Sequence, residues 1–284
     1  MLRFILILAV LGCGDDATSD AGRDAGGDVP TLDASADSGP GDAGAVDSGA
    51  ADSGPGDAGA MDSGGGGDDA GEPDAPSEMG FGAIAGPCAR LAGELASAEP
   101  SFYSTRLDFM DDAYDDPEER PMLTEDAVRL LESPNAGGSS QISEAFALEV
   151  LVRCEGADLI ATENEIEYEP MGSKKTDFLV EMMGGQRIGV SVVRAFMFPL
   201  GADYTVARAQ EVIGDKLDDI LESSANVTEE FEWDKQILAV LAPDDMPLES
   251  VMSAWMSFSE ERRADTIVYV IVTDGEDEGV YINR

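Results

Sequence analysis

Residues 14–78 restrict what this chain can fold into more than any other feature. They hold 17 acidic residues and a single base, Arg23, among glycine, alanine and serine. From Asp37 to Asp62 an aspartate recurs at every fifth position, followed by serine or alanine and then glycine. A repeat with almost nothing apolar to bury cannot recover the entropy lost on ordering its backbone. We therefore expect residues 13–78 to form a disordered linker and residues 79–284 to form one globular domain.

The composition of the 284-residue chain excludes several kinds of function. It has 59 acidic residues, 17 basic residues and no histidine, which gives a formal net charge of −42. Catalysis by Ser-His-Asp or Cys-His groups and histidine-ligated zinc sites are therefore excluded, and three cysteines are too few for a four-cysteine zinc site. Because so acidic a surface repels phosphates, we do not expect nucleic acid to be a partner.

The first residues have the pattern of an export signal. A positive start at Arg3 is followed by the apolar run 4–11, which is too short to cross a hydrocarbon core about 30 Å thick as a helix. The end of this run, Val10-Leu11-Gly12-Cys13, resembles the lipobox of bacterial lipoproteins. The alternatives are an ordinary cleaved signal or a buried cysteine on a short apolar segment.

The lipobox resemblance implies a location for the protein. Residues 1–12 would be a signal peptide that is removed before Cys13, and Cys13 would carry the lipid. Two or three acyl chains, at about 0.8 kcal/mol per buried methylene, anchor a protein stably in a lipid bilayer. The resemblance therefore implies a lipid-anchored, extracytoplasmic protein of the bacterial cell envelope, with the choice between inner and outer membrane left open.

Cys88 and Cys154 remain once Cys13 is assigned to the lipid. In an exported domain an even pair of cysteines favours a disulfide over two buried thiols. We expect this disulfide to join the first helix of the domain to the helix that precedes its strands.

Hydrophobic periodicity predicts an α/β domain with a mixed sheet. The expected order is α-β-β-β-α-β-α-β, preceded by two helices. The two preceding helices are placed at 87–98 and 124–132, and the segments that follow are a helix at 140–154, strands at 159–169, 176–182 and 188–194, a helix at 206–221, a strand at 237–241, a helix at 248–258 and a strand at 266–273. Residues 274–279 begin like a calcium loop, but we expect a hairpin turn between two final strands.

This order, together with three groups of residues, resembles the PD-(D/E)xK nuclease-like fold. Glu149 or Glu144 lies on the first helix of that core, Asp177 enters its second strand, and residues 190–194 end its third strand. In that family an acid on the helix, an aspartate on the second strand and a Glu-x-Lys on the third gather a divalent metal and activate water. The resemblance implies Glu149 and Asp177 as candidate metal ligands and Glu149, Asp177, Ser191 and Arg194 as candidate catalytic residues.

The third strand departs from the family motif. Ser191 stands where the glutamate belongs and Val193 where the lysine belongs, and Arg194 lies on the opposite face of the strand. Serine is a poor Mg²⁺ ligand, and an arginine is not expected to deprotonate water. Each candidate also has a structural alternative: a turn cap for Asp177, a solvated helix residue for Glu149, a core hydroxyl for Ser191 and an ion pair for Arg194.

We therefore expect a nuclease-like domain without catalytic activity and without a cofactor, which binds a protein or a small ligand. The alternative is a phosphodiesterase or nuclease that depends on Mg²⁺ or Mn²⁺ and has a non-standard active site. The sequence leaves open whether the domain is an enzyme.

Overall fold

The computed structural model describes residues 80–134 and 140–282. The expected signal peptide at 1–12, the lipidated Cys13 and the linker at 13–78 lie outside these residues.

The described residues form an α/β structure around one mixed sheet of seven strands, which confirms the predicted fold class. The strands lie in the order β1-β2-β7-β6-β5-β4-β3. Their bounds are Ala83–Ile84 for β1, Ser101–Asp108 for β2, Ala157–Thr162 for β3, Phe178–Met182 for β4, Arg187–Arg194 for β5, Lys235–Ala242 for β6 and Ile267–Asp274 for β7. Strands β2, β7, β6 and β5 run parallel, whereas β1, β4 and β3 pair antiparallel with their neighbours.

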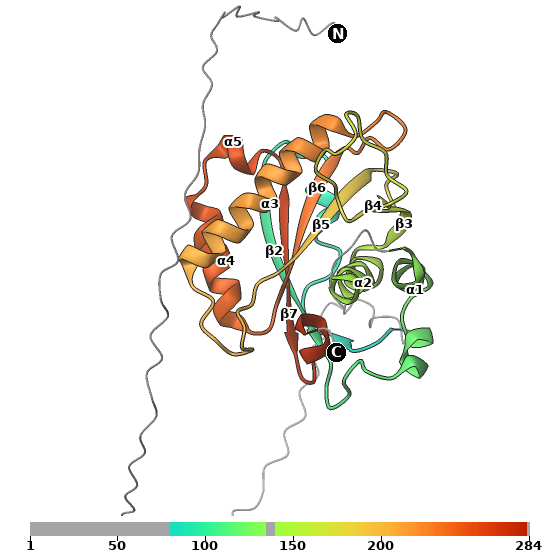
Figure 1. Ribbon diagram of the computed structural model, residues 1–284, viewed down its shortest axis with the longest axis vertical. Helices are drawn as coiled ribbons and strands as arrows, with labels where there is room; N and C mark the ends of the chain where they lie inside the picture. Colours follow the sequence, from blue (N-terminus) through green and yellow to red (C-terminus); the bar gives the residue numbers. More distant parts are fainter. Residues whose placement is uncertain (1–79, 135–139, 283–284) are drawn as a thin grey trace, which may run out of the picture. The chain divides into compact units, whose positions relative to one another are not determined.

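Helices cover both faces of the sheet (Figure 1). Their bounds are Glu125–Glu132 for α1, Gln141–Val150 for α2, Val206–Asn226 for α3, Asp245–Ser257 for α4, Glu260–Arg263 for α5 and Glu278–Tyr281 for α6. Shorter helical segments are η1 (Leu91–Gly93), η2 (Pro117–Met122) and η3 (Leu151–Glu155). Helices α1 and α2 pack on one face and α3 and α4 on the other.

The central strands are apolar on both faces because both faces are covered. Every residue of β6 is buried. Alternate residues point to opposite sides, so Ile237 joins the core beneath α2, and Leu238 joins the core beneath α3 and α4. Because β2, β7, β6 and β5 are parallel, their carboxyl ends lie at the same end of the sheet.

The helix expected at 87–98 is wrong: only the short η1 forms there, and the following segment forms the unexpected parallel strand β2. Tertiary contacts replace helical hydrogen bonds in this region. The backbone N–H of Leu91 donates to the buried Glu155 carboxylate at 3.0 Å. The Lys235 ammonium donates to the carbonyls of Glu94, Ser97 and Glu99 at 3.1, 2.8 and 3.1 Å.

The expected final hairpin is also wrong. Instead of a turn into another strand, β7 is followed by the short helix α6. The Thr273 hydroxyl hydrogen-bonds to the Asp277 carboxylate and, at 2.7 Å, to the Tyr281 hydroxyl. These buried bonds fold the segment back onto the end of β7. The strand expected at 159–169 is shorter too, because β3 ends at Thr162.

Cys88 and Cys154 are joined by a disulfide between positions 66 residues apart. It connects the loop before η1 to η3, rather than two helices as expected. The Ala89 N–H donates to the Cys154 carbonyl at 2.9 Å beside it. The disulfide therefore holds the first described loop against the end of the α2–η3 helical segment.

Candidate functional site

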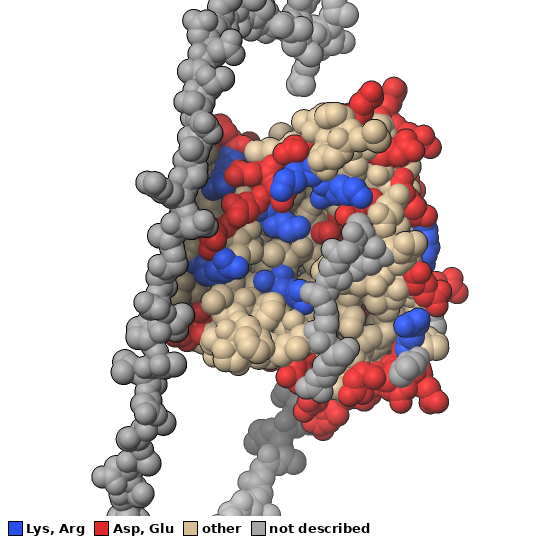
Figure 2. All heavy atoms as spheres, in the orientation of Figure 1, with Lys and Arg blue, Asp and Glu red and all other residues tan. Residues whose placement is uncertain are grey.

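A cleft of about 610 Å³ opens at the carboxyl end of β5, between α2 and α3. In α/β sheets, ligands bind in such crevices outside the carboxyl ends of parallel strands. The residues that line this α2–α3 cleft are Ser140, Ser143, Asp177, Val192, Val193, Arg194, Phe196, Met197, Phe198, Arg208, Val212 and Lys216. In Figure 2 basic side chains gather across the middle of the face shown, while acidic ones dominate its upper and lower margins.

Helix α3 supplies two of the three bases of the cleft. Arg208, Val212 and Lys216 follow one another at intervals of four residues, so they lie on one side of the helix. Thr205 caps the start of α3, and its side-chain oxygen accepts a hydrogen bond from the Arg208 backbone N–H at 3.3 Å. The cap fixes where the helix begins and hence where this row of side chains points.

Strand β5 supplies the third base, Arg194. Its guanidinium donates to the carbonyl of Tyr281 at 3.0 Å and to that of Val280 at 3.4 Å, both in α6. It also lies over the ring of Phe196, 5.5 Å from the centroid. Burial lowers the pKa of Arg194, and the nearby Glu144 carboxylate opposes that shift. An ion pair of Arg194 with Glu149 or Asp177, one form of the structural alternative for this residue, is not among the ion pairs of the described residues.

Asp177 lies at the entry to β4, beside the end of β5. Its backbone N–H donates to the Val190 carbonyl at 3.0 Å, and its carboxylate accepts from the Val192 N–H at 2.5 Å. Loss of solvent raises the pKa of Asp177, while the Lys216 charge acts in the opposite direction. Asp177 therefore ties two antiparallel strands together and also faces the cleft.

Glu144, rather than Glu149, is the acid of α2 that lies near Asp177. The Ser140 hydroxyl donates to the Glu144 carboxylate at 2.6 Å. Burial, followed by the charge of Asp177, raises the pKa of Glu144 to about 7, and Lys216 acts against this shift. A carboxyl that titrates near neutrality beside a cleft is a feature of functional sites.

Glu149 is a buried structural residue and not a solvated one. Its carboxylate accepts from the backbone N–H and the hydroxyl of Thr124, at 2.8 and 2.7 Å. Arg153, one helical turn further on, pairs with it at 3.5 Å. Burial raises the pKa of Glu149. Its side chain connects α2 to the cap of α1 and does not line the cleft.

Ser191 is likewise part of the core. Its hydroxyl and that of Thr176 hydrogen-bond to each other at 3.1 Å, and Thr176 also contacts the amide oxygen of Gln236 at 3.5 Å. All three side chains are buried. The hydroxyl of Ser191 thus has a partner inside the protein and does not point into the cleft.

The donor set does not fit the metal site of the nuclease-like family. Within residues 80–134 and 140–282, no group of three or more Asp, Glu, Cys or His side chains could hold an ion. Among the described residues Asp177 is the one carboxyl that lines the cleft, with Glu144 beside it, and β5 adds neither the acid nor the lysine of the motif.

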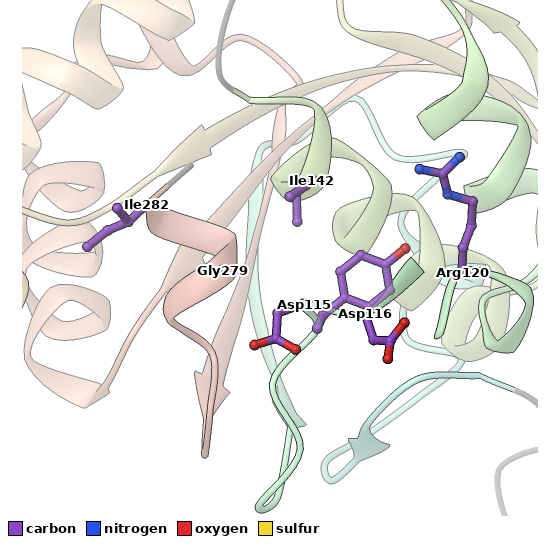
Figure 3. Close-up of a pocket in the computed structure, with 7 residues that line it drawn as sticks. Asp115, Asp116, Arg120, Ile142, Gly279 and Ile282 are labelled. Atoms are coloured by element: carbon purple, nitrogen blue, oxygen red, sulfur yellow. The ribbon is translucent and has the colours of Figure 1, made fainter. Parts of the chain in front are cut away.

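A second, smaller cavity of about 230 Å³ lies where α6 meets the loop before η2 (Figure 3). Ile282 and Arg120 stand at opposite sides of it, and Ile142 lies between them. The carboxylate of Asp116 is already used to cap η2, where it accepts from the Glu118 N–H at 2.9 Å. Arg120 pairs with Glu132 at 3.8 Å. These polar groups therefore serve the local structure, and the α2–α3 cleft is the better candidate.

Arg208 and Lys216 were not among the residues that the sequence singled out. Both residues lie on the helix that follows the third strand, eight residues apart, which is a little over two helical turns. Their side chains therefore lie on the same side of the helix, and this spacing could have identified them.

Comparison with known proteins assigns no family. No family model matches the chain, and no solved structure matches it. A curated relative, the AAC-rich mRNA clone AAC4 protein of Dictyostelium discoideum, is 37% identical over 155 residues. The match covers 52% of this chain but only 22% of that protein, which comes from a eukaryote. Of the helices in the described part of the chain, none has the length and apolar character needed to cross a membrane.

Proposed function

We propose that this protein is an extracytoplasmic lipoprotein of the bacterial cell envelope whose α/β domain is a non-catalytic binding module. In this proposal acyl chains on Cys13 attach it to a bilayer, and the acidic linker at 13–78 holds the domain away from the lipid surface. The domain binds its ligand, a protein or a small molecule, in the α2–α3 cleft. The observation that carries the proposal is the convergence of three bases, Arg194, Arg208 and Lys216, on this cleft.

A nuclease-like ancestry is part of the proposal. Helix α2 is followed by three strands, then α3 and β6, which is the element order of the PD-(D/E)xK fold. Glu144 of α2 and Asp177 at the entry to β4 lie near each other, as the helix acid and the strand aspartate do in that family. The third strand offers Ser191 and Val193 in place of the family's acid and lysine. These substitutions favour a domain that has kept the cleft and lost the chemistry.

A phosphodiesterase that uses Mg²⁺ or Mn²⁺ would need a third ligand or a substrate phosphate to complete its site. Calorimetric titration with Mg²⁺, Mn²⁺ and Ca²⁺, with an Asp177→Ala variant beside it, separates the two possibilities. We expect no saturable heat from any of these metals. Saturable binding of Mn²⁺ that is lost in Asp177→Ala, together with cleavage of a phosphodiester, would contradict a non-catalytic role.

The anchor has its own test. The protein is expressed in a bacterial host with labelled palmitate, and a Cys13→Ala variant serves as the matched control. We expect label in the membrane fraction for the natural chain and none for the variant. An unlabelled chain that retains Met1 and is recovered with the cytosol would overturn the lipoprotein assignment.

A further inference from the structure

We propose that the α2–α3 cleft takes a small ligand that carries one phosphate or carboxylate group next to an apolar ring or chain. This inference rests on the proposed binding function and names the chemical class of the ligand. It follows from the charge, the shape and the apolar wall of the same cleft.

The charge of the cleft is opposite to that of the domain around it. Residues 79–284 contain 42 acidic and 15 basic residues, yet the cleft collects Arg194, Arg208 and Lys216. Among the described residues Lys216 has no ion-pair partner within 4 Å, and Arg208 pairs only with its exposed helix neighbour Glu211, at 2.7 Å. Guanidinium groups match phosphate and carboxylate oxygens in a bidentate geometry. An anion therefore gains a contact that Lys216 does not already make and one that Arg208 makes only with an exposed side chain.

The other half of the cleft is apolar. Val192 and Val212 line it from β5 and α3, and the segment after β5 adds Phe196, Met197 and Phe198. The side chain of Phe198 is 78% exposed, which is unusual for a residue of this size and costs hydrophobic free energy unless something covers it. A ring or a short chain attached to the anionic group would cover this wall. A volume of about 610 Å³ is within the range of small-molecule sites.

Two carboxyls at the cleft act against an anion. Asp177 lines the cleft, and Glu144 lies beside it, behind Ser140. The groups that act on Glu144 come from every neighbouring element: Asp177 before β4, Glu163 after β3, Lys216 of α3, Arg194 of β5 and Ser140 of its own helix. The lining of the cleft itself holds three bases and one acid, Asp177, which favours an anionic ligand over a cationic one.

The experiment uses the full chain and four small probes in calorimetric titrations at pH 6.5. Phenyl phosphate and phenylacetate carry a ring and an anion, benzyl alcohol carries only the ring, and benzylamine carries a ring and a cation. We expect both anions to bind at least tenfold more tightly than benzyl alcohol, and no binding of benzylamine. Inorganic phosphate, which lacks the ring, should bind at least tenfold more weakly than phenyl phosphate.

Variants locate the binding. Lys216→Gln and Arg208→Gln should each weaken phenylacetate binding about tenfold. Lys174→Gln is the matched control, because it removes the same charge from a lysine that pairs with Asp219 of α3 at 2.9 Å and lies outside the cleft. We expect it to change binding less than twofold. Benzylamine binding as tight as that of phenylacetate, an equal effect of Lys174→Gln, or no binding by either anion would overturn the proposed ligand class.

These outcomes are separate from failure of the proposed function. Release of phenol from phenyl phosphate would show catalysis and contradict a non-catalytic module, but it would leave the ligand class intact. Absence of the acyl anchor would likewise leave it intact. A protein ligand captured without any effect of the anionic probes would overturn the ligand class alone.

Discussion

The carboxyl of Glu144, in the first turn of α2, lies close enough to the carboxyl of Asp177, at the entry to β4, for the charge of Asp177 to raise its pKa. Burial is the larger cause, and together they bring the pKa of Glu144 to about 7. Two acids from different elements thus share one partly enclosed space. The folded protein holds a proton there that the unfolded chain releases at lower pH.

The first prediction concerns stability against pH. Because the pKa of Glu144 is about 7 in the folded state and 4.5 in the reference state, its contribution is fully present below pH 4.5 and is lost as pH rises to about 7. The Glu144→Gln variant should therefore match the natural protein near pH 4.5 and be more stable at pH 8, by up to about 3 kcal/mol. Urea unfolding at both pH values measures this. A Glu181→Gln variant, at an exposed site of β4, should show no such gain.

The second prediction concerns ligand binding against pH. Phenylacetate keeps its charge between pH 6 and pH 8, so a change in its affinity reports on the protein. Ionisation of Glu144 places a second negative charge beside the cleft, so the affinity should fall about tenfold over this range. Calorimetric titrations at several pH values would show the fall, and Glu144→Gln should flatten it. Affinity that rises with pH would contradict the proposed role of this carboxyl.

The third prediction concerns Glu149. Replacing it by alanine leaves the buried Arg153 guanidinium without its ion-pair partner and removes the acceptor for the two hydrogen bonds of Thr124. Removing one partner of a buried pair costs about 3–5 kcal/mol. We expect a loss of this size in urea unfolding, with ligand affinity unchanged in the fraction that stays folded. A stable Glu149→Ala protein that has lost ligand binding would show that Glu149 belongs to the binding site.

The fourth prediction concerns Lys235. Its side chain is only 2% exposed and its ammonium donates to three backbone carbonyls of the segment after η1. Lys235→Met would leave these carbonyls without that donor and should cost about 2–4 kcal/mol. The exposed pair of Lys174 with Asp219 gives the control, because Lys174→Met should leave the free energy of unfolding nearly unchanged. Equal effects of the two substitutions would mean that the buried ammonium contributes little.

The fifth prediction concerns the disulfide. Closing a 66-residue separation between Cys88 and Cys154 should stabilise the fold by about 4 kcal/mol, since it restricts the unfolded chain. Unfolding in urea with and without dithiothreitol measures the difference. The double variant Cys88→Ala and Cys154→Ala should match the reduced protein and should not respond to the reagent. A reagent effect that persists in the double variant would point to another cause.

Sequence patterns located the apolar elements well. The continuous run expected at 266–273 is β7 at Ile267–Asp274, and the helical spacing expected from 206 marks α3. These segments are buried on the face or faces that their hydrophobic periodicity indicates, so the sequence pattern and the structure agree. The mixed sheet was therefore predictable.

Other elements depend on contacts that a local pattern does not contain. The segment 87–98 is rich in alanine and leucine and favours a helix, but Glu155 and Lys235, both distant in sequence, take up its backbone groups. Strand β2 pairs with β1 and β7 and is partly polar, so the alternation of apolar and polar residues along it is weak. Its aromatic and β-branched residues nevertheless favour a strand.

The candidate site was predicted in part. Asp177 and Arg194 were chosen from their places on the strands, and both line the cleft. Glu149 and Glu144 both lie on α2, and the sequence could not decide which one faces the strands, because the partner that buries Glu149 is Thr124, the cap of α1, outside the helix. Ser191 was placed on the correct strand, but its partner Thr176 settles its role in the core.

Arg194 lines the cleft, and its guanidinium also donates hydrogen bonds to two carbonyl oxygens of α6. An incoming oxyanion competes with those carbonyls for the same N–H groups. Binding of an anion in the cleft should therefore weaken the hydrogen bonds that hold α6. Faster hydrogen–deuterium exchange of the amides around Val280 would report that the cleft is occupied.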